Sequence, residues 1–152
     1  MTTIIIKGFG EKAMKKLLVP LRTSLCLLLI LFLVQTFSVA GEGILKTISP
    51  KEASDLIAKH KNNADFIILD VRTPREFKSG HIEKAILLDY YSKMYTEELK
   101  RLDKTKTYLI YCRTGNRTGK TLNLIKDMGF SRVYNMDKGI KGWRSKGFPV
   151  TK

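Results

Sequence analysis

The fold is decided by residues 107–118, which read TYLIYCRTGNRT. The first five residues are apolar or β-branched and predict a strand buried on both faces, as in a parallel sheet. Apolar side chains then recur at helical spacing over residues 118–128, and Gly129 ends that pattern. Cys112 stands at the carboxyl end of the predicted strand, where α/β proteins place their functional sites.

The same alternation of patterns extends to both sides of this segment. Besides 107–111, we expect strands at 44–48, 66–70, 85–88 and 133–135. Besides 118–128, we expect helices at 49–60, 73–80, 92–102 and 140–146. Strands that alternate with helices predict an α/β fold of three layers, with a central parallel sheet and helices on both faces.

The N-terminal part of the chain has the pattern of an export signal. Residues 25–34 read LCLLLILFLV and contain ten consecutive apolar side chains. Basic residues precede this run, and Ser38-Val39-Ala40 follows it. This order of basic, apolar and small residues is typical of a secretory signal peptide, whereas a membrane span usually needs about 20 apolar residues.

We therefore expect a signal peptide at residues 1–40 and a single domain at 41–152 that is exported to the periplasm. An uncleaved leader that anchors the domain to a membrane is the alternative. The segment before Lys15 is long for a leader. A start at Met14 would give the more typical beginning MKKLLVPLRTS, so we expect translation to begin there.

The charge of the predicted domain limits its partners. Residues 41–152 carry 23 basic and 13 acidic side chains, a net charge of +10. This surplus suits anionic small molecules, acidic partners or membrane headgroups, and it also fits a merely solvated basic surface. No basic run exceeds two residues, so we expect no nucleic-acid partner. Two isolated histidines and one cysteine make no metal-ligand cluster, so we expect no metal and no cofactor. One domain with no evident apolar extension fits a monomer.

Cys112 is the one cysteine of residues 41–152, because Cys26 lies in the predicted leader. It cannot form an internal disulfide, and an exported protein that keeps a free thiol either buries it or uses it. Gly115 and Asn116 tolerate unusual backbone angles, so the loop can curl with its N–H groups inward, at the positive end of the next helix. We expect the pKa of Cys112 to lie below the value of about 8.5 of a free cysteine.

Residues 112–118, CRTGNRT, resemble the active-site loop of the rhodanese-type sulfurtransferases. The resemblance continues in residues 70–77 (DVRTPREF), 80–82 (GHI), 134–136 (YNM) and 147–150 (GFPV). It covers nearly all of residues 44–150 and is greatest to the single-domain, exported members. It implies a rhodanese-like fold and an enzyme of the thiosulfate sulfurtransferase type.

The resemblance also implies a reaction. Cys112 would accept the outer sulfur of a small anionic donor such as thiosulfate, carry it as a persulfide, and pass it to cyanide or to a thiol acceptor. The donor would be held by a loop that comprises Arg113, Thr114, Gly115, Asn116, Arg117 and Thr118.

Supporting roles follow for several charged residues. Arg113 is expected to reach the donor anion, and Arg117 to brace the loop against a carboxylate such as Asp70 or Glu76, because a buried acid needs a paired base. Asp70 is expected either to accept hydrogen bonds from the next turn or to pair with Arg72.

The length of the loop bears on the choice of chemistry. Four residues separate Cys112 from Arg117. Related phosphatases and arsenate reductases of this fold use one residue more, which enlarges the pocket for a tetrahedral oxyanion, so the shorter loop favours sulfur transfer. The main alternative is a non-catalytic rhodanese-like module that senses oxidants or docks partners through Cys112.

Other residues carry milder expectations. His81 is expected to be a structural hydrogen-bonding residue and Trp143 a core residue. Lys138 stands where the family usually has a glycine, and we expect this to change a surface turn. Tyr90–Tyr91 and Tyr95 fall in a variable region that borders the active-site mouth in the family, where they are expected to shape the choice of acceptor.

Overall fold

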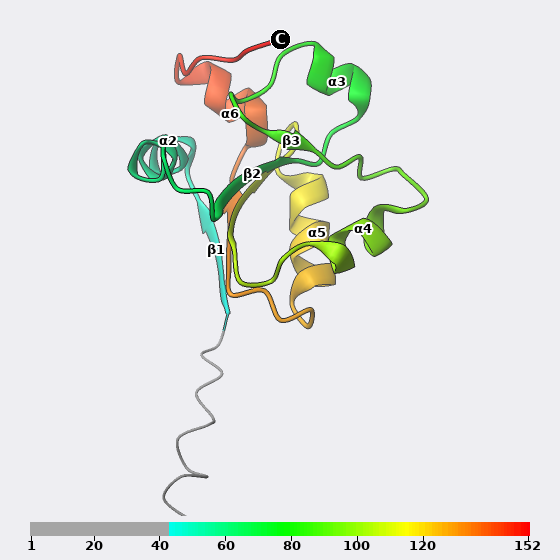
Figure 1. The fold of residues 1–152 in the computed structure, drawn as a ribbon. Coiled ribbons are helices and arrows are strands. Elements are labelled where there is room, and N and C mark those ends of the chain that lie inside the picture. Colours follow the sequence, from blue (N-terminus) through cyan, green and yellow to red (C-terminus); the bar gives the residue numbers. More distant parts are fainter. Residues whose placement is uncertain (1–42) are drawn as a thin grey trace, which may run out of the picture. The chain divides into compact units, whose positions relative to one another are not determined.

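A computed structural model describes residues 43–152 (Figure 1). The predicted leader and the predicted start at Met14 lie outside the described residues. All five strands are parallel and form one sheet in the order β1-β5-β4-β2-β3. The strands are β1 (Ile44–Ile48), β2 (Phe66–Asp70), β3 (Ile86–Leu87), β4 (Thr107–Tyr111) and β5 (Arg132–Met136).

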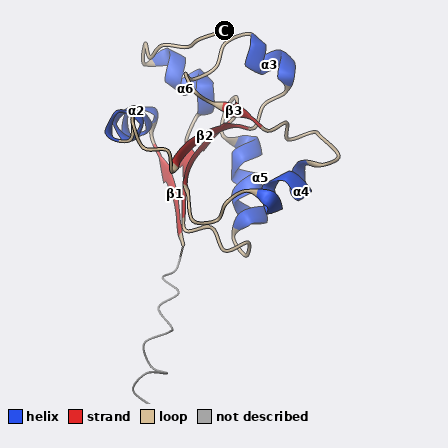
Figure 2. Cartoon of the chain, in the orientation of Figure 1, coloured by secondary structure: helices blue, strands red, loops and turns tan. Residues whose placement is uncertain are grey.

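Helices cover both faces of this sheet (Figure 2). They are α2 (Pro50–Lys59), α3 (Pro74–Lys78), α4 (Tyr95–Arg101), α5 (Asn116–Ile125) and α6 (Gly139–Ser145). Helices α2 and α6 pack on one face, around Leu109 and Met136. Helices α4 and α5 pack on the other, around Ile110 and Val133. The predicted α/β fold of three layers is thus confirmed.

The two helix starts that carry proline have complete caps. The side chain of Ser49 accepts a hydrogen bond from the N–H of Glu52, whose carboxylate accepts one from the N–H of Ser49. Thr73 and Glu76 repeat this reciprocal pair at the start of α3. Such capping boxes satisfy N–H groups that the first turn of a helix leaves free, so short sequence signals suffice to start both helices.

Several predicted boundaries are wrong. Strand β3 has only two residues, because Ala85 closes a turn with Ile82 just before it. Helix α4 begins at Tyr95 and not at Ser92, whose hydroxyl accepts the N–H of Met94 within a preceding turn. Helix α5 runs from Asn116 to Ile125, two residues ahead of the predicted start and three short of the predicted end.

A buried ion pair fixes the connection from β2 to α3. Arg72 Nη2 lies 2.6 Å from Asp70 Oδ2, and both side chains are almost wholly buried. The backbone N–H of Arg72 donates to Asp70 Oδ1, so both predicted arrangements of Asp70 occur together. Arg72 also donates to the carbonyl of Gly80, beyond α3. The pair therefore ties the end of a central strand to both ends of the next helix.

Within residues 43–152, every helix is too short or too polar to cross a membrane.

Candidate active site

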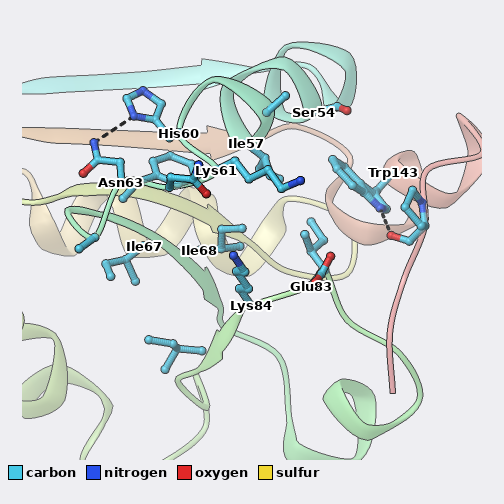
Figure 3. A pocket seen from close by; sticks show the side chains of 17 residues that line it. Ser54, Ile57, His60, Lys61, Asn63, Ile67, Ile68, Glu83, Lys84 and Trp143 are labelled. Carbon is cyan, nitrogen blue, oxygen red and sulfur yellow. Dashed lines mark hydrogen bonds between the residues drawn. The ribbon is translucent and has the colours of Figure 1, made fainter.

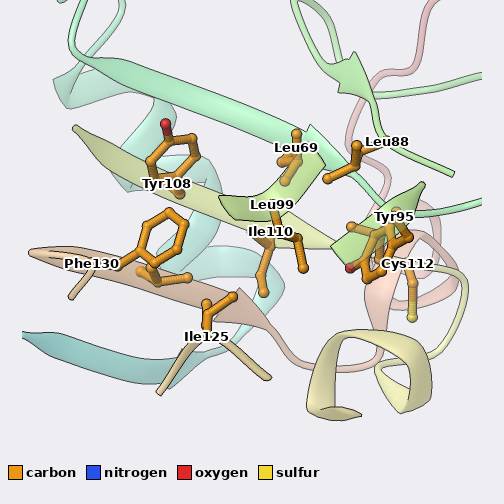
Figure 4. Close-up of a cluster of buried hydrophobic side chains, with 11 residues drawn as sticks. Leu69, Leu88, Tyr95, Leu99, Tyr108, Ile110, Cys112, Ile125 and Phe130 are labelled. Carbon is orange, nitrogen blue, oxygen red and sulfur yellow. The ribbon is translucent and has the colours of Figure 1, made fainter. Parts of the chain in front are cut away.

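Cys112 follows the last residue of β4, near the middle of the carboxyl edge of the sheet. Its thiol is free and 1% exposed, and it packs in the same apolar cluster as Tyr95 (Figure 4). A buried thiol without further partners would be inert. The loop that follows supplies such partners.

The loop curls back over the sulfur. Gly115 adopts φ +97°, a left-handed conformation that glycine reaches without steric cost. This turn brings the N–H of Gly115 to 3.1 Å from Cys112 Sγ. Thr118, in the first turn of α5, places its hydroxyl oxygen 3.8 Å from the same sulfur.

Two opposing effects set the pKa of Cys112. Burial raises it, but hydrogen bonds from the backbone N–H groups of Thr118, Thr114 and Gly115 together outweigh burial and lower it. The Thr118 hydroxyl donates its own proton to the carbonyl of Gly115 at 3.0 Å. The net result is a pKa below the usual value of the thiol. The site therefore favours a sulfur anion in a place from which water is largely excluded.

The carbonyl groups of the loop are held on its other side, by α6. The N–H of Ile140 donates to the carbonyl of Cys112 at 2.8 Å, and that of Lys141 to the carbonyl of Arg113 at 3.1 Å. Gly139 makes this approach possible, since a Cβ there would lie 2.3 Å from the carbonyl oxygen of Cys112. Because these two carbonyl groups point away from the sulfur towards α6, the N–H groups later in the loop can face the sulfur. This role of Gly139 was not predicted from the sequence, although a glycine after a predicted strand was a signal for it.

Arg117 braces the loop as expected, and its partner is Glu76. The guanidinium donates from Nη1 and Nη2 to the two carboxylate oxygens, each at 2.7 Å. Through this bond the Arg117 side chain lowers the pKa of Glu76 to about 2. Because Glu76 also completes the cap of α3, one carboxylate joins α3 to the loop.

The other predicted site residues divide into two groups. Arg113, Thr114 and Asn116 are exposed at the rim of the loop. Asp70 pairs with Arg72, and Arg72 also donates to the carbonyl of Gly80. Neither side chain forms a hydrogen bond with a side chain of the Cys112 loop. These two residues fix the neighbouring strand end.

The milder expectations had mixed outcomes. His81 Nδ1 bonds to the carbonyl of Phe77, and Trp143 is buried, as expected. Lys138 lies exposed in the turn before α6, as expected, and has φ +56°, a left-handed conformation that residues other than glycine rarely adopt. Tyr91 is exposed with its ring 5.7 Å from the Arg117 guanidinium carbon, but Tyr95 is buried and cannot line a surface.

A separate cavity of about 710 Å³ lies on the opposite face of the sheet, beside α2 and the loop before β3 (Figure 3). Ile57, Ile68 and Trp143 are among its lining residues, and Cys112 is not. Among residues 43–152, no group of three or more histidine, cysteine, aspartate or glutamate side chains could hold a metal ion.

Replacement of Gly139 by alanine should disturb the sulfur site. The Cβ would collide with the Cys112 carbonyl in a backbone region that disfavours side chains, so we expect a loss of about 2–3 kcal/mol in unfolding free energy. With misdirected N–H groups the thiol pKa should rise by about one unit, which slows alkylation of Cys112 at pH 7 about tenfold. Iodoacetamide kinetics measure this.

Gly119→Ala is the matched control. A Cβ at Gly119 meets nothing within 4 Å and stands inside α5. This variant should gain about 0.5–1 kcal/mol of stability and keep the wild-type alkylation rate. Equal effects of the two substitutions on that rate would contradict the role given to Gly139.

The Glu76–Arg117 pair predicts a pH dependence of stability. The pKa of Glu76 is about 2 in the folded protein, below its ordinary value of 4.5, so its contribution is complete above pH 4.5 and is lost as the pH falls towards 2. Because the carboxylate is partly exposed, we expect wild type to lose about 1–2 kcal/mol more than Glu76→Gln over this range. Urea unfolding at several pH values measures the difference. Glu83→Gln, which removes an exposed carboxylate, should lose as much unfolding free energy over this range as wild type. A loss as small as that of Glu76→Gln would refute the role given to the Glu76–Arg117 pair.

Comparisons with known proteins agree with the fold. Residues 49–146 match the family model of the rhodanese-like domain. The chain is 32% identical over 100 residues to thiosulfate sulfurtransferase GlpE from Pseudomonas entomophila, covering 66% of this chain and 85% of that protein. It is 27% identical over 99 residues to a sulfurtransferase from Allochromatium vinosum, covering 65% of this chain and 91% of that one.

Two further relatives are covered less completely. The chain spans 56% of an uncharacterized protein from Synechocystis and 26% of the probable adenylyltransferase/sulfurtransferase MoeZ from Mycobacterium tuberculosis. Among solved structures, the BH2092 protein from Bacillus halodurans is similar with a TM-score of 0.58 and 29% identity, over 70% of this chain and 76% of that one. The chain belongs to the rhodanese-like domain family and has sulfurtransferases among its relatives.

Proposed function

We propose that the chain is a thiosulfate sulfurtransferase in which Cys112 carries sulfur as a persulfide. The observation that carries the proposal is the convergence of loop N–H groups on one buried sulfur that lies at the end of a central strand. Thiosulfate or a similar anion is the donor, and cyanide or a thiol is the acceptor.

The first half-reaction loads the cysteine. The Cys112 thiolate attacks the outer sulfur of thiosulfate, a new S–S bond forms, and the S–S bond of the donor breaks with its electron pair leaving on sulfite. A lowered thiol pKa supplies the attacking anion near neutral pH. Arg113, exposed at the loop rim, is placed to attract the oxygens of the donor.

The second half-reaction unloads it. An acceptor thiolate or cyanide attacks the outer sulfur of the persulfide, and the bonding pair returns to Cys112 as thiolate. The N–H groups of Thr114, Gly115 and Thr118 stabilise the negative charge before and after transfer, because they face the sulfur in advance. No external oxidant or reductant is needed, since the two steps balance.

The size of the loop supports sulfur as the transferred group. Four residues separate Cys112 from Arg117, and the Arg117 side chain is committed to Glu76. Such a loop leaves its backbone N–H groups to bind the ligand. A compact ring of N–H groups suits a single sulfur atom better than a tetrahedral phosphate.

We also propose that residues 1–40 form a leader and that residues 41–152 act as one exported, monomeric domain in the periplasm. The support is the basic, apolar and small-residue order of the N-terminal segment. N-terminal sequencing of the protein recovered from the periplasm should begin at or near Gly41. Recovery of the chain from the cytoplasm with its N-terminal segment intact would refute this proposal, and recovery from the membrane would support the anchored alternative.

Incubation with thiosulfate should load one sulfur on the protein. We expect intact-mass measurement to show one added sulfur atom, which cyanide then removes with release of thiocyanate. Cys112→Ser should show neither result, while Tyr134→Phe, a change on another strand, should behave as wild type. An unchanged mass for folded wild-type protein would sink the persulfide proposal, and hydrolysis of an aryl phosphate would favour phosphatase chemistry.

A further inference from the structure

A chain of buried hydroxyl groups lies behind the Cys112 loop. Tyr95, the first residue of α4, is 4% exposed, and Thr121 on α5 is fully buried. Tyr95 Oη lies 2.6 Å from Thr121 Oγ1. The Thr121 hydroxyl donates to the carbonyl of Arg117 at 2.9 Å, so its one proton is committed and the Tyr95 hydroxyl is the donor in the first bond.

This chain ends at the turn that serves the sulfur. Arg117 immediately precedes Thr118, whose backbone N–H lowers the pKa of Cys112 and whose hydroxyl oxygen lies 3.8 Å from its sulfur. A movement of the Arg117 carbonyl therefore moves the peptide group that carries the Thr118 N–H. Tyr95 and Cys112 also belong to one apolar cluster, in which Figure 4 places them next to each other.

The first turn of α5 is held from outside by the Arg117–Glu76 pair, but it has no side-chain cap. Its N-cap is Gly115, which has no side chain to accept the free N–H groups, whereas α2 and α3 have complete capping boxes. A hydrogen bond from outside the helix is a means to hold such a turn.

We propose that Tyr95 is a positioning residue for Cys112: through Thr121, its hydroxyl fixes the first turn of α5 and keeps the Thr118 N–H directed at the sulfur. The role in catalysis rests on the proposed sulfur transfer, but the effect on the thiol itself does not. Burial, opposed by the hydrogen bond with Thr121 and assisted by the charges of Tyr90 and Cys112, raises the pKa of Tyr95 to about 12. Tyr95 therefore remains a hydrogen-bond donor throughout the pH range in which Cys112 titrates.

The test compares two tyrosine-to-phenylalanine variants. Tyr95→Phe removes the hydroxyl and keeps the ring. Tyr108→Phe is the matched control, because Tyr108 is buried in the same cluster and its hydroxyl donates to the carbonyl of Asp103 at 2.9 Å. Tyr108 lies near the start of β4, whereas Cys112 follows the end of that strand. The readout is the rate of iodoacetamide alkylation as a function of pH, with Tm recorded for each variant.

We expect Tyr95→Phe to raise the midpoint of the alkylation profile and to slow alkylation at pH 7 about threefold, which corresponds to half a pKa unit. Tyr108→Phe should lower Tm to a similar extent and leave the profile unchanged. If Tyr95→Phe keeps the wild-type profile, whatever its Tm, the residue is merely structural and the proposal is overturned.

Thr121→Val provides an independent route should Tyr95→Phe fold poorly. It should shift the profile in the same direction, and the double variant should shift it no further than the larger single change, because both substitutions break one chain of bonds. Additive shifts would overturn the proposed linkage. If wild-type protein forms no persulfide with thiosulfate, the proposed function fails, while the alkylation profiles still decide the role of Tyr95.

Discussion

The hydrogen bonds from backbone N–H groups to the sulfur of Cys112 are the constraint around which this structure is arranged. A sulfur anion that is shielded from water needs several donors at fixed positions. A flexible loop would not hold them, because each N–H group would turn to water. The loop from Cys112 to Thr118 holds them because the carbonyl groups of Cys112 and Arg113 are bound on the outside, by the N–H groups of Ile140 and Lys141.

Elements far apart in the sequence contribute to this arrangement. Glu76 caps α3 and also holds Arg117, so the position of α3 is transmitted to the start of α5. The Asp70–Arg72 pair fixes the chain between β2 and α3 and thus the place from which Glu76 reaches the loop. Each of these ion pairs is restrained by further hydrogen bonds, which makes removal of one partner costly. The position of the site therefore depends on contacts among the β2–α3 connection, helix α3 and the Cys112 loop.

Much of the fold could be predicted because its signals are local. Ser49 with Glu52, and Thr73 with Glu76, mark helix starts within four residues, and the apolar run before Cys112 marks a central strand. The boundaries that were wrong depend on hydrogen bonds that sequence spacing does not reveal. Ser92 was such a case, because its hydroxyl serves a turn and the helix begins only at Tyr95.

The same distinction applies to the site. The cysteine, the glycine turn and the flanking arginines are contiguous, so their chemistry could be inferred from residues 112–118. Gly139 and Tyr95 act across the fold, and nothing in their neighbouring residues tells which atoms they approach.

The central claim is that the fold itself turns Cys112 into a stabilised thiolate. Ultraviolet titration of the thiolate, in the folded protein and again in concentrated urea, tests it most directly, with Cys112→Ser as the blank for tyrosine ionisation. The account predicts a midpoint for the folded protein that lies clearly below the value of about 8.5 expected for the unfolded chain. A folded midpoint equal to or above the unfolded one would mean that burial outweighs the N–H groups, and would contradict the account.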